Sequence, residues 1–147
     1  MIEVRFHGRG GQGAQVASKV LAVAFFHENF YVQSFPAFGV ERRGAPVMAF
    51  LRVDRRPIHL RVNIYQPDHV IVLDPTLIGA VDVAAGLKQN GWILINSHQP
   101  PEVFVSLNAF RTATVDATSI AIRNGLGSRT SPIVNTAILG AFSKVSG

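Results

Sequence analysis

The chain has 147 residues, of which 48% are hydrophobic and 16% are charged, and its formal net charge is +5. This length suits one domain around a single buried core. Because the sequence contains no cysteine, disulfides, thiolate metal sites and cysteine-ligated iron–sulfur clusters are excluded within the chain.

The arrangement of apolar and basic residues excludes further classes. The longest apolar stretches, residues 20–26 and 45–51, are much shorter than the roughly 20 residues that span a bilayer, and the N-terminus lacks the features of a signal peptide. We therefore expect a cytoplasmic protein with no membrane partner. Basic residues are scattered, so we expect no nucleic-acid partner either; a phosphate-bearing ligand or an acidic protein explains the charge better.

The N-terminal half reads as strands with one long helix. Apolar residues recur at helical spacing over residues 12–27, and proline and glycine predict a loop over residues 36–46. Alternation and β-branched residues predict strands over residues 2–7, 30–35 and 47–53, with a weaker extended segment near residues 58–62.

The C-terminal half continues the alternation. Residues 69–75 form a nearly all-apolar run typical of a buried parallel strand, and a helix is predicted over residues 76–89. A final helix is predicted from Ser131 and Pro132 to the C-terminus, because proline is favoured at the first helical position. The remaining predicted elements are strands over residues 92–97 and 110–117 and a short helix that ends at Arg123.

Strands that alternate with helices predict an α/β fold. We expect a Rossmann-like, doubly wound and mostly parallel sheet, in a single domain over residues 1–147.

A glycine-rich turn follows the first predicted strand and opens the first predicted helix. Such a turn lets the backbone approach an anion, while the helix N-terminus supplies N–H groups and partial positive charge. Within it, Arg9 would add a cation and Gln12 an amide. The alternative is that the glycines only let the helix pack closely on the strand. The candidate binding residues are Gly8, Arg9, Gly10, Gly11, Gln12 and Gly13.

A stand-alone NAD(P)- or FAD-binding domain is the first alternative that this turn suggests. Such a domain needs an acidic residue about 20 residues beyond the motif, at the end of the second strand, to bind the ribose hydroxyls. That position here reads Gln33-Ser34-Phe35-Pro36, and Glu28 and Glu41 lie outside it. The missing acid weakens this interpretation.

The loop at residues 38–46 is a second candidate for anion binding. It places Glu41 beside Arg42 and Arg43, followed by Gly44, and paired guanidinium groups bind phosphate or carboxylate through forked hydrogen bonds. A solvated loop, or one that forms ion pairs within the chain, is the alternative.

Other polar residues have simpler explanations. Asp74 ends a buried strand, where it suits either a ligand or a helix cap, and His7 is best explained as a hydrogen-bonded packing residue. Ser128, Thr130 and Ser131 could bind phosphate oxygens, although capping explains them better. The histidines show no metal-ligand spacing, and no catalytic residue is predicted.

Five segments together resemble a known family. They are HGRGGQG at residues 7–13, GVERRGAPV at 39–47, PDHVIVLDP at 67–75, GWILINS at 91–97 and NTAILGAF at 135–142. The chain resembles the gamma subunit or gamma domain of the 2-oxoacid:ferredoxin oxidoreductases, which include pyruvate synthase. The most specific part is GRGGQG followed about 28 residues later by ERRG, usually E-x-R-G in the family.

The resemblance implies a role in a larger enzyme. Such enzymes decarboxylate a 2-oxoacid on thiamine diphosphate, send electrons through iron–sulfur clusters to ferredoxin and pass the acyl group to coenzyme A. It implies that alpha and beta chains hold thiamine diphosphate and that a delta-type chain, often with beta, holds the clusters.

For the gamma chain itself, the resemblance implies a Rossmann-like layer that packs on the alpha chain and is associated with coenzyme A binding. By position, residues 8–13 and 41–44 would bind coenzyme A or shape a subunit contact, and the isolated chain would be inactive. A homodimer is a further arrangement that the resemblance allows. Gamma chains of the family commonly extend some tens of residues beyond the position of Gly147.

Overall fold

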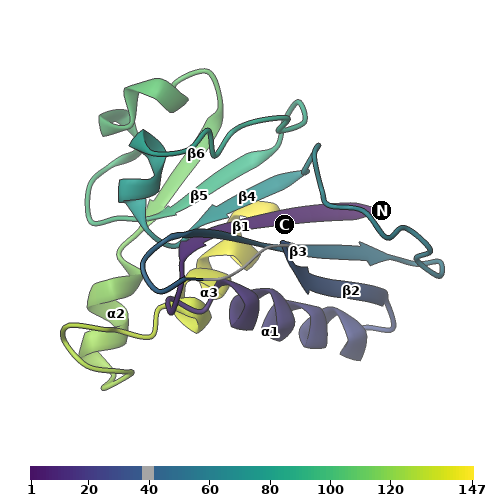
Figure 1. The fold of residues 1–147 in the computed structure, drawn as a ribbon, viewed down its shortest axis with the longest axis horizontal. Helices are drawn as coiled ribbons and strands as arrows, with labels where there is room; N and C mark the ends of the chain where they lie inside the picture. The colour runs from purple at the N-terminus through teal and green to yellow at the C-terminus, as the bar shows by residue number, and fades with distance from the viewer. Residues whose placement is uncertain (38–41) are drawn as a thin grey trace.

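The computed structural model describes residues 1–37 and 42–147 and is built on a six-stranded sheet with the order β2-β3-β1-β4-β5-β6 (Figure 1). The strands are β1 (Ile2–Arg9), β2 (Tyr31–Pro36), β3 (Pro46–Asp54), β4 (His69–Val72), β5 (Trp92–Asn96) and β6 (Arg111–Val115). The α-helices are α1 (Ala14–His27), α2 (Ala117–Arg123) and α3 (Asn135–Ser146). Three short 3₁₀ helices complete the elements: η1 (Pro75–Gly79), η2 (Pro101–Val103) and η3 (Val105–Leu107).

The sheet is mixed, with a parallel majority. Strands β1, β4, β5 and β6 run parallel to one another, whereas β3 is antiparallel to both of its neighbours, β1 and β2. The predicted α/β class with a mostly parallel sheet is confirmed. The carboxyl ends of β1, β4 and β5 meet at one edge, where open α/β sheets bind their ligands.

The three α-helices share one face of the sheet. In Figure 1, α1 and α3 lie side by side on that face. Alternate residues of β1, such as Val4 and Phe6, are buried there together with Ala14 and Ala17 of α1 and Ile138 of α3. The small alanine side chains let α1 pack close to the strands.

The opposite face is covered differently. Over β4 and β5, Val70 and Ile93 pack against Leu77, Val83 and Leu107, which come from the irregular segment with the 3₁₀ helices. Over β1 and β3 the same face carries polar side chains, among them Arg5 and Arg52, both buried. This face therefore holds the buried charges of the molecule's described part.

The predicted helix over residues 76–89 is wrong, because only η1 forms there. Gly86 has φ +70°, and a Cβ on it would clash with the carbonyl oxygen of Tyr65. The carbonyl groups of Val83 and Ala85 accept hydrogen bonds from Arg5. The segment is therefore shaped by contacts with distant parts of the chain and not by its own helical bonds.

Two smaller predictions are also wrong. Residues 58–62 form no strand. The last helix begins at Asn135 and not at Ser131 or Pro132, because Pro132 pairs with Gly127 in an isolated β-bridge. The other predicted strands and helices are confirmed to within a few residues. None of the helices in the described part is long and apolar enough to cross a membrane.

Candidate functional site

The glycine turn joins β1 to α1 in backbone conformations that favour glycine. Gly11 has φ +89°, and Gly13, at the N-cap of α1, has φ +83°. Residues that carry a side chain rarely adopt these φ values, so both positions need glycine for the chain to turn from strand to helix. Within the described residues no side chain caps α1, which leaves its first N–H groups there without a capping acceptor.

Gly10 lets the turn contact the second candidate loop. Its N–H donates to the carbonyl of Ala45 (2.9 Å), and its carbonyl accepts from the N–H of Gly44 (3.2 Å). A Cβ at Gly10 would clash with the carbonyl oxygen of Arg42. The structure thus brings together the two motifs that the sequence placed about 30 residues apart.

The side chains of Arg9 and Gln12 are bonded to other groups of the protein. The Gln12 side chain accepts from the Arg9 N–H (2.7 Å) and donates to Asp74 (2.8 Å). The Arg9 guanidinium lies 3.3 Å from the Asp74 carboxylate and donates to the Thr76 hydroxyl (3.0 Å) and the Gly44 carbonyl (3.0 Å). These two side chains therefore fix the shape of the turn.

Asp74 is the centre of this network. It caps η1 by accepting from the Thr76 N–H (2.9 Å) and hydroxyl (2.6 Å), as the capping alternative predicted. Burial acts to raise the pKa of Asp74, but the hydrogen bonds from Thr76 and Gln12 and the charge of Arg9 outweigh it and lower that pKa below its usual value. The carboxylate therefore stays ionised and keeps Arg9 in place.

A crevice of about 420 Å³ opens beside the turn, at the carboxyl ends of β1, β4 and β5. Asn96, at the end of β5, donates to the Leu73 carbonyl (3.1 Å) and the Thr118 hydroxyl (3.0 Å). It thereby links the end of β4 to the first turn of α2 beneath the crevice. The sequence analysis missed Asn96 and Thr118; an amide at the end of a buried strand was the signal for them. The polar residues that line the crevice are Gly11, Gln12, Arg43, Asn96, Thr118, Thr130 and Ser131.

The predicted cations differ in their positions. Arg43 lines the crevice, and its guanidinium donates no hydrogen bond within residues 1–37 and 42–147. Arg42 is exposed and contributes its carbonyl to the tight turn that ends at Ala45. Glu41 lies outside the described residues.

The remaining candidates have structural roles. Ser128 accepts from the Ser131 N–H (3.0 Å) and shares a hydrogen bond with Thr130 (3.1 Å). Helix capping, the explanation expected for this loop, is wrong, because α3 begins at Asn135 and its N-cap residue, Val134, makes no side-chain capping bond among the described residues. His7 is a buried packing residue, as predicted: its Nε2 accepts from the Nε of Arg5 (3.0 Å). Burial, and then the charge of Arg5, lower the pKa of His7 to about 3, so the imidazole is neutral. Within the described ranges, no three acidic or histidine side chains are grouped to hold a metal ion.

Comparisons with known proteins agree with one another. The family model for pyruvate ferredoxin/flavodoxin oxidoreductase matches residues 3–147. The chain is 55% identical to the pyruvate/ketoisovalerate oxidoreductases common subunit gamma of Pyrococcus furiosus, over the whole chain and 79% of that relative. It is 54% identical to pyruvate synthase subunit PorC of Methanothermobacter marburgensis, over the whole chain and 78% of that relative.

Solved structures show the same likeness. The crystal structure of pyruvate oxidoreductase subunit PORC from Thermotoga maritima superimposes with a TM-score of 0.82 at 37% identity, covering 99% of this chain and 76% of that one. The gamma subunit of a keto/oxoacid ferredoxin oxidoreductase from Geobacter sulfurreducens gives a TM-score of 0.69 at 22% identity, covering 97% and 75%, which shows a shared fold.

Proposed function

The chain belongs to the pyruvate ferredoxin/flavodoxin oxidoreductase family, and from this premise we propose that its crevice binds the phosphate groups of coenzyme A. It is a gamma subunit of a 2-oxoacid:ferredoxin oxidoreductase, and so one part of a multi-subunit enzyme. The proposal concerns what this subunit contributes to that enzyme.

The observation that carries the proposal is the meeting of the glycine turn and the 42–45 segment at the crevice. Gly11 presents a backbone N–H that donates to no atom of the described residues, and Arg43 adds a guanidinium at the same place. Backbone N–H groups beside a helix N-terminus, together with an arginine, suit a phosphate. Thr130 and Ser131, which carry hydroxyls, line the same crevice.

We expect Arg9 and Gln12 to act as positioning residues. Their contacts with Asp74 and with the backbone hold the turn open toward Arg43. Gly8 has the same kind of role, since a Cβ there would lie 3.3 Å from the Cβ of Ala14 and force strand and helix apart.

The sheet order disfavours the alternative of a stand-alone NAD(P) or FAD domain. In a dinucleotide-binding fold the strand after the first helix lies parallel beside the first strand and carries the ribose-binding acid. Here the neighbour of β1 on that side is the antiparallel β3, and β2 lies one strand further away. Gln33 of β2 is hydrogen-bonded to Arg52 (2.9 Å) and to the Leu60 carbonyl (2.8 Å).

We further propose that alpha, beta and delta-type chains complete the enzyme in the cytoplasm and hold its thiamine diphosphate and iron–sulfur clusters. The sequence offers no cysteine for a cluster. Exposed apolar residues recur at helical spacing on α1 and suit a subunit contact, with a second copy of the chain as the other occupant. They are Val16, Val20, Val23 and Phe26.

Steady-state kinetics of the assembled enzyme test the coenzyme A role. We expect Arg43→Ala to raise the KM for coenzyme A about tenfold, equivalent to about 1.4 kcal/mol, with little change in the KM for the 2-oxoacid. Arg56→Ala removes an equally exposed arginine from the turn after β3 and serves as the matched control. An unchanged KM for coenzyme A in Arg43→Ala would show that the turn serves assembly alone.

Calorimetric titration of the isolated chain separates the nucleotide alternatives. Coenzyme A should give a binding signal that Arg43→Ala weakens, whereas NAD, NADP and FAD should give none. The isolated chain should show no oxidoreductase turnover. Tight binding of NAD or FAD would favour the dinucleotide alternative instead.

A further inference from the structure

Two polar side chains of β1 are buried on the face opposite the helices. Arg5 is 5% exposed and His7 4% exposed. The Arg5 Nη2 donates to the carbonyls of Val83 (3.0 Å) and Ala85 (2.6 Å), and its Nε donates to the Nε2 of His7 (3.0 Å). The pair is therefore held rigidly between the strand and the 81–85 segment.

Each of these side chains keeps one donor nitrogen that has no partner among the described residues. Because the Nε2 of neutral His7 accepts a hydrogen bond, its proton lies on Nδ1. Neither this Nδ1 nor the Nη1 of Arg5 donates to any atom in the described part of the chain, and Arg5 forms no ion pair there. Burying a guanidinium is costly: desolvation by burial lowers the pKa of Arg5, and the charge of Asp82, which makes no ion pair with it, only partly opposes this.

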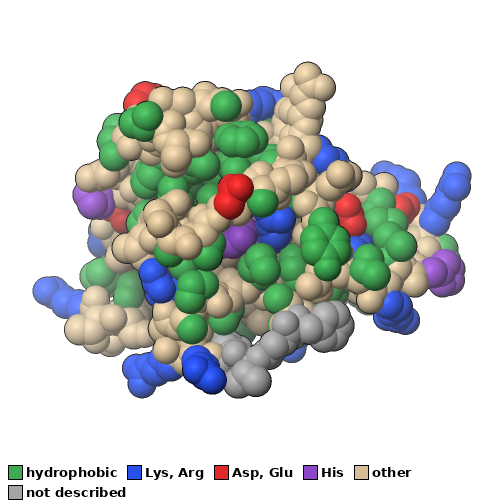
Figure 2. All heavy atoms as spheres, turned by 45° about the horizontal axis from the view of Figure 1, so that its top comes forward, with side chains coloured by type: hydrophobic (Ala, Val, Ile, Leu, Met, Phe, Trp, Pro, Cys, Tyr) green, Lys and Arg blue, Asp and Glu red, His purple; other side chains and the backbone are tan. Residues whose placement is uncertain are grey.

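Both residues line a hollow of about 940 Å³, which also reaches the glycine turn and the first residues of α1. Figure 2 shows basic, histidine and acidic side chains close together near the centre of this face, with hydrophobic side chains around them. Met48 pairs with His7 across β1 and β3, so its side chain lies on the same face beside the imidazole. Val81 and Ala85 form the facing wall.

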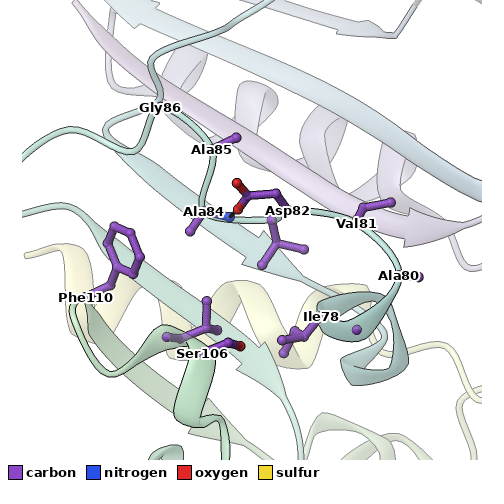
Figure 3. Close-up of a pocket in the computed structure, with 12 residues that line it drawn as sticks. Ile78, Ala80, Val81, Asp82, Ala84, Ala85, Gly86, Ser106 and Phe110 are labelled. Carbon is purple, nitrogen blue, oxygen red and sulfur yellow. Dashed lines mark hydrogen bonds between the residues drawn. The ribbon is translucent and has the colours of Figure 1, made fainter.

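The 81–85 segment separates this hollow from a second one. Figure 3 shows the second hollow, of about 690 Å³, beside Ile78, Ser106 and Phe110; the side chains of Val81 and Ala85 point away from Phe110. Asp82 lines both hollows and is exposed, with its carboxylate accepting from the Ala84 N–H (3.1 Å). An acidic group therefore lies at the mouth and not in contact with Arg5.

We propose that the hollow over Arg5 and His7 binds a small organic monocarboxylate with an apolar body. The carboxylate would accept from the Arg5 Nη1 and the His7 Nδ1, and the apolar body would lie against Met48, Val81 and Ala85. One buried cation with Asp82 at the mouth suits a single negative charge better than a phosphate group, which carries more. Branched and unbranched 2-oxoacids belong to this chemical class. The proposal does not depend on coenzyme A binding in the crevice.

Titration of the full chain with isovalerate tests this directly. We expect calorimetry to give a dissociation constant of about 1 mM or tighter, with 3-methyl-2-oxobutanoate behaving similarly. Isovaleramide has the same shape without the charge and should bind at least tenfold more weakly. In nuclear magnetic resonance spectra, isovalerate should shift the Nδ1 signal of His7 and leave that of exposed His59 unchanged.

Replacing Arg5 itself, as in Arg5→Met, would remove the hydrogen bonds that hold the 81–85 segment and could disturb folding. Two alanine residues near the hollow are therefore replaced instead. Ala85→Phe fills the hollow from an exposed position and should abolish isovalerate binding. Ala80→Phe places the same ring in the neighbouring hollow and should leave binding intact. Equal binding by isovaleramide, persistence of binding in Ala85→Phe, or no binding of either acid at roughly 20 mM would overturn the proposal. Loss of isovalerate binding on assembly with the other subunits would also overturn it, because the carboxylate would then come from a partner protein.

Discussion

The Arg5–His7 pair lies on β1, and the glycine turn begins at the end of the same strand. The arginines of the two regions nevertheless differ in burial and in their partners. Arg9, at the turn, is partly exposed and has a carboxylate, a hydroxyl and a carbonyl as partners. Arg5 is buried, and its partners in the described part of the chain are carbonyl and imidazole groups. Water could hydrogen-bond to the partly exposed guanidinium of Arg9 without these partners. We therefore infer that its contacts fix the conformation of the glycine turn. The incomplete set around Arg5 leaves hydrogen-bonding capacity facing the hollow.

The turn depends on one close backbone approach, and Gly10→Ala should have the largest effect on stability. The new Cβ would clash with the Arg42 carbonyl, a backbone atom that cannot move aside without breaking the hydrogen bonds to Gly44 and Ala45. We expect a loss of about 3 kcal/mol in the free energy of unfolding, measured by chemical denaturation.

Gly140→Ala is the matched control for that substitution. Gly140 lies within α3, and nothing lies within 4 Å of a Cβ built on it. Alanine there should stabilise the helix by up to about 1 kcal/mol. Equal stability of both variants would mean that the turn and the 42–45 segment are not held together in solution.

The buried pair makes stability depend on pH through His7. Its pKa is about 3 in the folded chain, lowered by burial and then by the charge of Arg5, whereas an unfolded histidine titrates near 6.5. Between pH 6.5 and 3 the unfolded chain therefore binds a proton at His7 that the folded chain does not bind. The free energy of unfolding is highest above pH 6.5 and falls as the pH drops toward 3. We expect His7 to account for a loss of about 3 kcal/mol by pH 4.

Denaturation curves of the parent chain and His7→Gln, recorded between pH 7.5 and 4, measure this. The variant should lose most of the pH dependence, with a remainder from His69, whose pKa is also lowered by burial. Identical pH profiles would mean that the His7 imidazole is protonated in the folded chain as readily as in the unfolded chain.

Asp74 organises the turn, and Asp74→Ala should cost less than Gly10→Ala. It removes the cap on Thr76, the partner of Gln12 and the counter-charge of Arg9, all near the surface. We expect a loss of about 2 kcal/mol in the free energy of unfolding. A loss of less than about 0.5 kcal/mol, the usual effect of a surface substitution, would show that the network adds nothing to the turn.

Periodicity predicted most of the fold because the pattern repeats within each element. The strands and α1 follow their own hydrophobic spacing, and α2 forms where a short helix ending at Arg123 was predicted. The segment after η1 could not be predicted in this way. Its carbonyls are bonded to Arg5, which lies 78 and 80 residues away, and its glycine is fixed by the distant Tyr65.

The candidate site also has features that the sequence predicts and features that it does not. Gly11 and Gly13 were predictable, since a strand-to-helix turn needs positive φ values. The inward direction of Arg9 was not, because it depends on Asp74 and Thr76, which are far apart from it in sequence. Arg5 was overlooked altogether, since alternation in a strand gives no sign that an arginine faces a buried hollow.

Arg9→Met should have the smallest effect and is the most direct test of the contrast with Arg43. The ion pair with Asp74 is partly exposed, and Gln12 and Thr76 still hold that carboxylate, so we expect a loss of less than 1 kcal/mol in stability. In the assembled enzyme the KM for coenzyme A should change less than twofold, because the Arg9 guanidinium is directed at Asp74 and not into the crevice. A KM increase as large as that of Arg43→Ala, without loss of stability, would mean that Arg9 leaves Asp74 for the phosphate when coenzyme A binds. The turn would then resemble the Arg5 region in keeping a cation available for ligand.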